Sequence, residues 1–250
     1  MPDTSLKPAR RRVESGSLDN VSITPPKKAV FVELGLLSCF TFLRGASDAV
    51  DLVGTAHALG YDSIGIADVN SFAGVVRVHS ESKTLKIRPV IGTRIETIEG
   101  LHFLAYPVDR AAYGRLCNLI STGRTRTLNG GWQAKGKCEI SLEMLMNDSE
   151  GVQLILIPPT NLEKDFTVPA WLGNTVSFNG RSNLSNCISV KFDRLVSLLV
   201  EALPSFRHIA ASYLYCGDDV ARIERLNGMA QTNGLSLLAT NDVHYATPDR

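Results

Sequence analysis

The chain has 250 residues, and its 26 lysine and arginine side chains nearly balance 25 aspartate and glutamate side chains, for a net charge of +1. This near neutrality excludes an autonomous, strongly basic nucleic-acid-binding domain. Hydrophobic residues make up 44% of the chain, which is typical of a globular protein. No apolar run reaches the roughly 20 residues of a membrane helix, and the first 30 residues lack the apolar core of a signal peptide. The five cysteines have no C-x-x-C spacing, which excludes a cysteine zinc ribbon and favours a cytoplasmic protein.

Residues 1–28 differ in composition from the rest of the chain. They hold six basic side chains against three acidic ones, together with four prolines. We interpret this segment as a disordered basic arm. Weak phosphate attraction by Arg10, Arg11 and Arg12 is the alternative to an arm without a partner.

Residues 29–250 form one predicted domain in which apolar runs of strand length alternate with amphipathic stretches. The patterns predict strands at 29–37, 63–67, 87–95, 101–106, 152–157, 168–176, 186–190, 207–213 and 235–240, and helices at 47–59 (capped by Ser47), 72–85, 109–120, 141–145 (capped by Ser141), 192–203 and 218–233. A polar break is expected at 121–140. About seven alternations predict an α/β fold with a mostly parallel sheet and right-handed crossovers.

Polar side chains follow two of these apolar strands. Asp68 ends the second strand, and Asp242 and His244 follow the last one. In an extended segment residues i and i+2 point the same way, so Asp242 and His244 are expected to project together, with Asp68 as a possible third ligand of a transition-metal ion. The alternative is that both aspartates cap turns and His244 packs in the core. The residues alone favour this alternative, because three ligands are few for a catalytic cluster of metals.

The polar break also concentrates basic and aromatic residues. Arg124, Arg126, Lys135 and Lys137 form a basic loop, which is either simply solvated or in contact with nucleic-acid phosphates in a larger complex. The two tryptophans, Trp132 and Trp171, lie in irregular segments. Each would either stack on a base or anchor its segment in the core.

Several motifs in a fixed order carry a resemblance to a known family. They are FVEL at 31–34, FTFLRGAS at 40–47, IADVNSFAGVVR at 66–77, DRAAYGRLC at 109–117, YCGDD at 215–219 and ATNDVHY at 239–245. The chain from about residue 31 onward resembles the start of the bacterial error-prone DNA polymerases, C-family enzymes related to the DNA polymerase III alpha subunit. The resemblance implies a PHP (polymerase and histidinol phosphatase) domain over residues 29–250, with a distorted seven-stranded (β/α)7 TIM-like barrel.

The chain departs from the family at its metal site. A catalytic PHP domain resembles Asp-x-His-x-His-Thr on its first strand, whereas Gly35 and Leu37 stand at the two histidine positions here. Val69 replaces the histidine of the second motif, and Arg94 replaces a glutamate on the third strand. The resemblance therefore implies a vestigial site with no tightly bound cofactor and at most a weak divalent ion, on the remaining ligand-type residues Asp68, Asp242 and His244.

The resemblance also implies a division of labour. In this family the polymerase palm, thumb and fingers follow the PHP domain, so the magnesium-dependent catalytic residues are expected outside these 250 residues. The domain would brace the polymerase body of an enzyme that copies DNA across lesions during repair, with DNA and accessory repair proteins as indirect partners. The alternatives are a metal-dependent phosphoesterase or 3′–5′ exonuclease, and a non-enzymatic protein-binding barrel.

Overall fold

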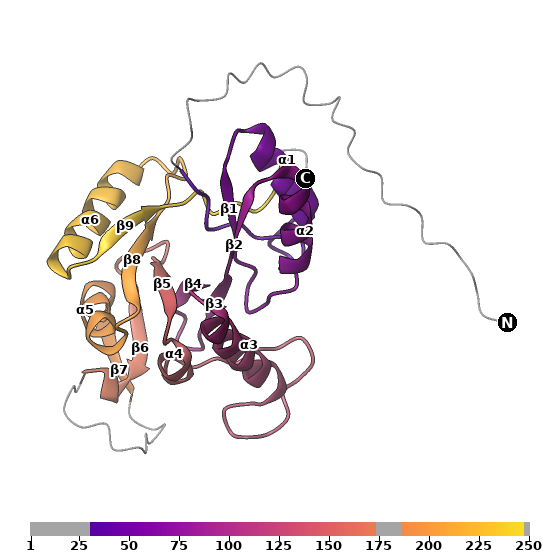
Figure 1. The fold of residues 1–250 in the computed structure, drawn as a ribbon. Helices are drawn as coiled ribbons and strands as arrows, with labels where there is room; N and C mark the ends of the chain where they lie inside the picture. Colours follow the sequence, from indigo (N-terminus) through magenta and orange to yellow (C-terminus); the bar gives the residue numbers. More distant parts are fainter. Residues whose placement is uncertain (1–30, 174–186, 248–250) are drawn as a thin grey trace.

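The computed structural model describes residues 31–173 and 187–247 (Figure 1). The predicted basic arm at 1–28 lies outside the described residues. The strands are β1 Ser63–Ile66, β2 Arg88–Ile91, β3 Thr93–Glu96, β4 His102–Pro107, β5 Val152–Ile157, β6 Asp165–Pro169, β7 Cys187–Lys191, β8 Phe206–Ala211 and β9 Ser236–Ala239. The helices are α1 Ala49–Ala58, α2 Val75–Leu85, α3 Arg110–Thr125, α4 Leu142–Asp148, α5 Phe192–Ala202 and α6 Asp219–Thr232, with a short 3-10 helix, η2, at Ala170–Gly173.

The strands form a five-stranded sheet in the order β3-β4-β5-β8-β9, a parallel pair β1-β2 and an antiparallel hairpin β6-β7. Within the five-stranded sheet β4 is antiparallel to both neighbours, whereas β5-β8 and β8-β9 are parallel. Four of these five strands therefore run in one direction and β4 runs against them, so the prediction of a mostly parallel sheet holds except at β4. A tight turn in which Gly100 has φ +78° joins β3 to β4 and reverses the direction of the chain. The described strands do not form one closed hydrogen-bonded ring.

Two predicted strands are interrupted. The part of the predicted strand 29–37 that the structure describes, residues 31–37, makes a single parallel bridge, between Glu33 and Ile64, and lies along β1 through backbone bonds such as Gly65 N to Glu33 O at 2.7 Å. The predicted strand 87–95 is divided at Gly92 into β2 and β3. A Cβ atom at Gly92 would lie 2.5 Å from the ring of Tyr106, so only glycine allows the chain to pass this close to β4.

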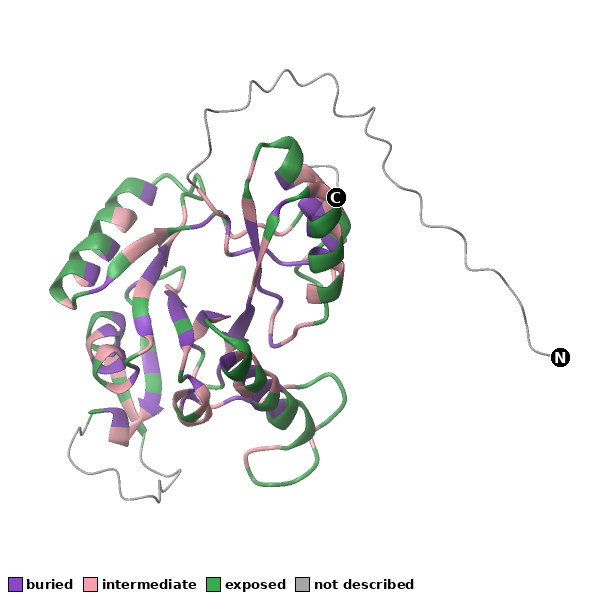
Figure 2. Ribbon diagram, in the orientation of Figure 1, coloured by how far each residue is buried: buried purple, intermediate pink, exposed green. Residues whose placement is uncertain are grey.

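The helices pack their apolar faces on the sheets. The larger core lies between the five-stranded sheet and α3 to α6, and it includes the fully buried rings of Phe103, Phe192 and Phe206. A second core lies between α1, α2 and β1. In Figure 2 the buried residues gather along the strands, and the exposed residues lie on the outer faces of the helices. Burial of each such phenylalanine stabilises the fold by about 1.5–3 kcal/mol.

The helix ends test the predicted caps. Ser141 caps α4 as predicted, because its hydroxyl accepts from Met144 N at 3.2 Å. The predicted cap at Ser47 is wrong: the Asp48 carboxylate accepts from Val50 N, and the Ser47 hydroxyl instead accepts from Ala246 N at 2.8 Å. Ser47 thus ties the start of α1 to the far end of the chain. Helix α3 continues into the predicted polar break, since it ends at Thr125.

Candidate functional site

A cleft of about 620 Å³ opens where the chain leaves β5, β8 and β9. Its charged lining has four basic side chains, three acidic ones and two histidines. The basic ones are Arg44, Arg94, Lys164 and Arg222, the acidic ones are Asp218, Asp219 and Asp242, and the histidines are His102 and His244. Two of the three predicted ligand residues, Asp242 and His244, belong to this lining. Burial lowers the pKa of His102, and Arg94 and Arg44 act in the same direction against Glu96, so the cleft favours a neutral imidazole.

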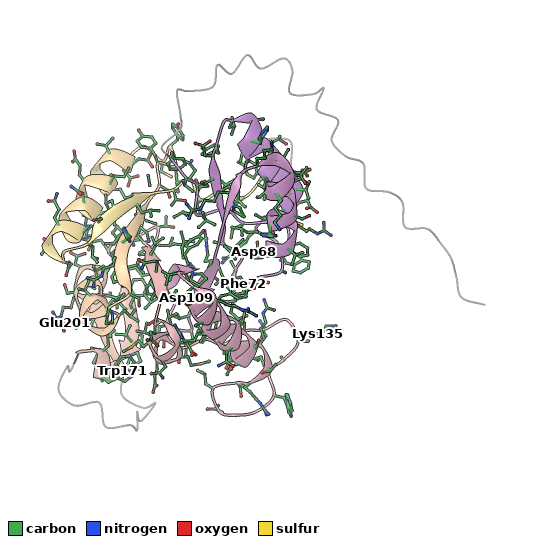
Figure 3. The ribbon with its side chains drawn as sticks, in the orientation of Figure 1. Asp68, Phe72, Asp109, Lys135, Trp171 and Glu201 are labelled. Atoms are coloured by element: carbon green, nitrogen blue, oxygen red, sulfur yellow. The ribbon has the colours of Figure 1, made fainter. Side chains whose placement is uncertain are left out.

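Asp68, labelled in Figure 3, has its carboxylate occupied by a neighbouring loop. The residue is 1% exposed, and its Oδ1 accepts from Ser38 N at 2.8 Å, Ser38 Oγ at 2.9 Å and Thr41 Oγ1 at 2.9 Å. Its Oδ2 accepts from Ser38 Oγ at 2.8 Å and lies 2.5 Å from where a Cβ of Gly74 would stand. This carboxylate therefore fastens the 38–41 loop to the end of β1, which is a structural task.

Arg94 belongs to the wall of the cleft. Its guanidinium is 6% exposed and forms an ion pair through Nη2 with Asp242 Oδ1, while its backbone N donates to Asp68 O at 3.0 Å. The other oxygen of Asp242, Oδ2, lies 3.4 Å from His244 Nε2. Asp242 has φ +50°, so it is not in the extended conformation that the sequence spacing assumed, yet the two side chains do meet.

A second buried carboxylate joins the two ends of the domain. Glu33 is 3% exposed and accepts from Gly35 N at 2.6 Å, from Asn241 N at 2.7 Å and from Thr240 Oγ1. A Cβ atom at Gly35 would run into Thr240 Oγ1 and stand 3.2 Å from Glu33 Oε1. Sequence reasoning missed this cluster. Its available signal was a lone acidic residue, Glu33, within an apolar run.

The residues present do not fit a multi-metal cluster. Among residues 31–173 and 187–247, no group of three or more histidine, cysteine, aspartate or glutamate side chains is placed to hold a metal ion. The fixed positive charge of Arg94 pairs with Asp242, and three donors, Ser38 N, Ser38 Oγ and Thr41 Oγ1, already occupy the Asp68 carboxylate. The weak divalent ion predicted on Asp68, Asp242 and His244 stays a prediction.

The predicted nucleic-acid contacts, Arg124 and Arg126, lie outside the cleft lining. Arg124 Nε donates to Asn70 O at 2.9 Å, which ties the end of α3 to the loop after β1. The Arg126 guanidinium lies 4.0 Å from the centre of the exposed Trp132 ring. Trp171, in η2, is half-buried and packs against the larger core, so the two tryptophans have different surroundings.

The fold belongs to a known family. The family model of the PHP domain matches residues 33–194, and the chain belongs to this family. Over 222 residues it is 34% identical to the error-prone DNA polymerase of Caulobacter vibrioides, and over 229 residues 36% identical to that of Rhodopseudomonas palustris. These alignments cover 88% and 90% of this chain but 18% of each relative. The chain is therefore homologous to the N-terminal region of error-prone DNA polymerases, which confirms the resemblance read from the motifs.

Solved structures agree on the fold. A candidate metal-dependent phosphoesterase from Bifidobacterium adolescentis has a TM-score of 0.57 at 13% identity, over 90% of this chain and 91% of that one. An amidohydrolase from Chromobacterium violaceum has a TM-score of 0.56 at 13% identity, over 86% and 87%. At such low identity the likeness concerns the mixed α/β fold alone. Within the residues that the structure describes, no helix has the length and apolar character needed to span a membrane.

Proposed function

We propose that this chain acts as the PHP domain of an error-prone DNA polymerase and that its role there is structural. In this proposal the strands make a distorted (β/α)7 barrel that braces a polymerase body. The parent enzyme would copy damaged DNA in the bacterial cytoplasm, and magnesium-dependent nucleotidyl transfer would take place in that body. Similarity to error-prone polymerases over about nine-tenths of the chain supports this proposal.

The observation that carries the structural role is the position of Arg94. A guanidinium keeps its charge at every physiological pH and cannot act as a metal ligand. Its ion pair with Asp242 links β3 to the segment that follows β9. We infer that this internal cation supplies the attraction that metal ions supply in a catalytic PHP domain, so that the rim of the barrel is held without them.

Exposed apolar side chains support a docking role. Phe42 and Leu43 are 85% and 106% exposed, and Tyr215 is 89% exposed. The loops that carry them also supply Arg44 and Leu214 to the wall of the cleft. Contiguous exposed apolar patches mark interaction sites, and interfaces between domains of one chain bury roughly 600–1,500 Å². We propose the polymerase body as the occupant, with accessory repair proteins as further partners of the whole enzyme.

Metal content and hydrolysis together test the structural role. We expect the purified chain, incubated with zinc, manganese or magnesium and then desalted, to retain less than one ion per chain. We also expect no hydrolysis of a phosphodiester or of a DNA 3′ end above a His244→Ala control. Two or more tightly held ions together with hydrolysis that His244→Ala abolishes would establish the phosphoesterase alternative instead.

A further inference from the structure

The segment after α3 is an ordered loop that projects from the body of the domain (Figure 1). We call residues 126–137 the Trp132 loop; Figure 3 labels Lys135 on it. Its backbone is folded on itself: Arg126 and Trp132 form an antiparallel bridge, and Thr127 N donates to Gly131 O at 2.9 Å. Gly130 has φ +80°, which the turn between them requires. The loop therefore holds the Trp132 ring in a defined place.

Trp132 has an exposed ring with one supported face. The residue is 76% exposed, and the Arg126 guanidinium lies 4.0 Å from its ring centre. A tryptophan that anchors its segment in a core is buried. Trp171 is half-buried and packs against the larger core, whereas the Trp132 ring does not. A guanidinium stacked on an indole fixes the ring and leaves the rest of its surface to water. Such a ring is a platform on which a nucleobase can stack.

The charge around this ring favours an anionic partner. Arg126, Lys135 and Lys137 are exposed, and none of them forms an ion pair in the part of the chain that the structure describes. The acidic residue nearest in sequence, Glu139, accepts from Leu128 N at 3.2 Å. Arg124 is engaged with the backbone of the loop after β1, so it adds little to this surface.

We propose that the Trp132 loop binds single-stranded DNA, with one base stacked on Trp132 and the flanking phosphates on Arg126, Lys135 and Lys137. A single strand is favoured over a duplex because stacking on a side chain needs an unstacked base, whose faces a duplex hides. This inference goes beyond the proposed function, because it depends on the loop alone and not on the polymerase body or on the cleft. Because the loop offers few contacts, it binds the DNA strand weakly and acts as an auxiliary DNA-binding site.

Binding is measured on the 250-residue chain by the anisotropy of a labelled oligothymidylate at low salt. We expect saturable binding to the single strand, weaker binding to the matching duplex, and a log–log salt dependence with a slope of roughly −2, because three phosphates each contribute about 0.7 in a single strand. A Trp171→Phe variant makes Trp132 the sole tryptophan, and its fluorescence should be quenched as the oligonucleotide binds. An oligouridylate arm distinguishes DNA from RNA.

Matched variants decide the assignment. Trp132→Ala should weaken binding by about 5- to 150-fold, since a stacked base is worth roughly 1–3 kcal/mol. Joint Lys135→Glu and Lys137→Glu substitutions should flatten the salt slope, whereas Lys83→Glu, on the exposed side of α2, should change nothing. Binding that Trp132→Ala leaves unchanged, tighter binding to the duplex or preference for the uridylate would overturn the proposal. Loss of polymerase-body association alone in Trp132→Ala would assign the loop to a protein contact instead.

Discussion

Arg94 and Asp242 are 148 positions apart in the sequence and form an ion pair in the wall of the cleft. The two partners differ in burial: the Arg94 side chain is 6% exposed and the Asp242 side chain 30% exposed. The pair is therefore asymmetric. Loss of the arginine leaves a carboxylate that water can reach, whereas loss of the aspartate leaves a buried cation without a counter-charge.

This asymmetry predicts the order of two destabilisations. Asp242→Ala should lower the free energy of unfolding by about 3 kcal/mol, and Arg94→Ala by about 1–2 kcal/mol. The difference arises because only the aspartate substitution leaves a buried charge without a partner. Urea denaturation of both variants measures the difference. Asp242→Asn is the matched control, since its amide oxygen still accepts from the guanidinium, and it should fall between wild type and Asp242→Ala. The reverse order would mean that Arg94 acts mainly through packing.

The elements that local pattern determines were predictable. The strand predicted at 152–157 coincides with β5, because an apolar run interrupted only by Gln153 lies there between Gly151 and Pro158. The apolar run at 29–37 looks similar in sequence, but its described residues, 31–37, make one bridge only. Its outcome depends on which strands lie beside it, and that is a property of the whole fold.

The candidate site shows the same limit. Spacing alone indicated that Asp242 and His244 lie together, and their side chains do meet, although Asp242 adopts φ +50°. Spacing gave no sign that the Glu33 carboxylate would accept from Thr240, 207 positions away. Only the family motif drew attention to Arg94. Nothing in the sequence around an arginine within an apolar strand indicates which carboxylate will pair with it.

Gly35 stands where a catalytic PHP domain has its first metal-binding histidine, and Thr240 lies against it. This pair tests whether a larger side chain can be placed at position 35. A Cβ at position 35 would run into Thr240 Oγ1, so Gly35→Ala should destabilise by about 1–3 kcal/mol, as overpacking does. Thr240→Ala alone removes a hydrogen bond to Glu33 and should cost about 1 kcal/mol. The double variant should cost less than the sum, because the second substitution makes room for the first. Strict additivity in a double-mutant cycle would show that the clash is relieved elsewhere.

Asp219 predicts a dependence of stability on pH. Burial acts to raise the pKa of this carboxyl group, but hydrogen bonds from the backbone N–H groups of Leu214, Cys216 and Gly217 outweigh it and lower the pKa. Because the folded pKa lies below the unfolded value of about 3.9, the contribution is present above that value and is lost as pH falls through the folded pKa. The stability difference between wild type and Asp219→Asn should thus be constant near neutrality and shrink below about pH 4. A difference that grows on acidification would contradict the assignment.

The Asp219 carboxylate also shapes the loop that presents Tyr215, and this loop leads to the last prediction. Phe42 and Tyr215 are among the most exposed apolar side chains of the described residues, and the net charge of +1 provides little repulsion between copies. We expect the 250-residue chain to self-associate as its concentration rises, as measured by light scattering, and to become monodisperse when the polymerase body of a relative is added. Phe42→Ser with Tyr215→Ser should reduce both the self-association and the binding of the body. Val76→Ser, at a 76% exposed position on α2, is the control and should change neither. A wild-type chain that stays monomeric at high concentration and ignores the added body would show that these loops are not a docking surface, and an independent binding module would then explain the domain better.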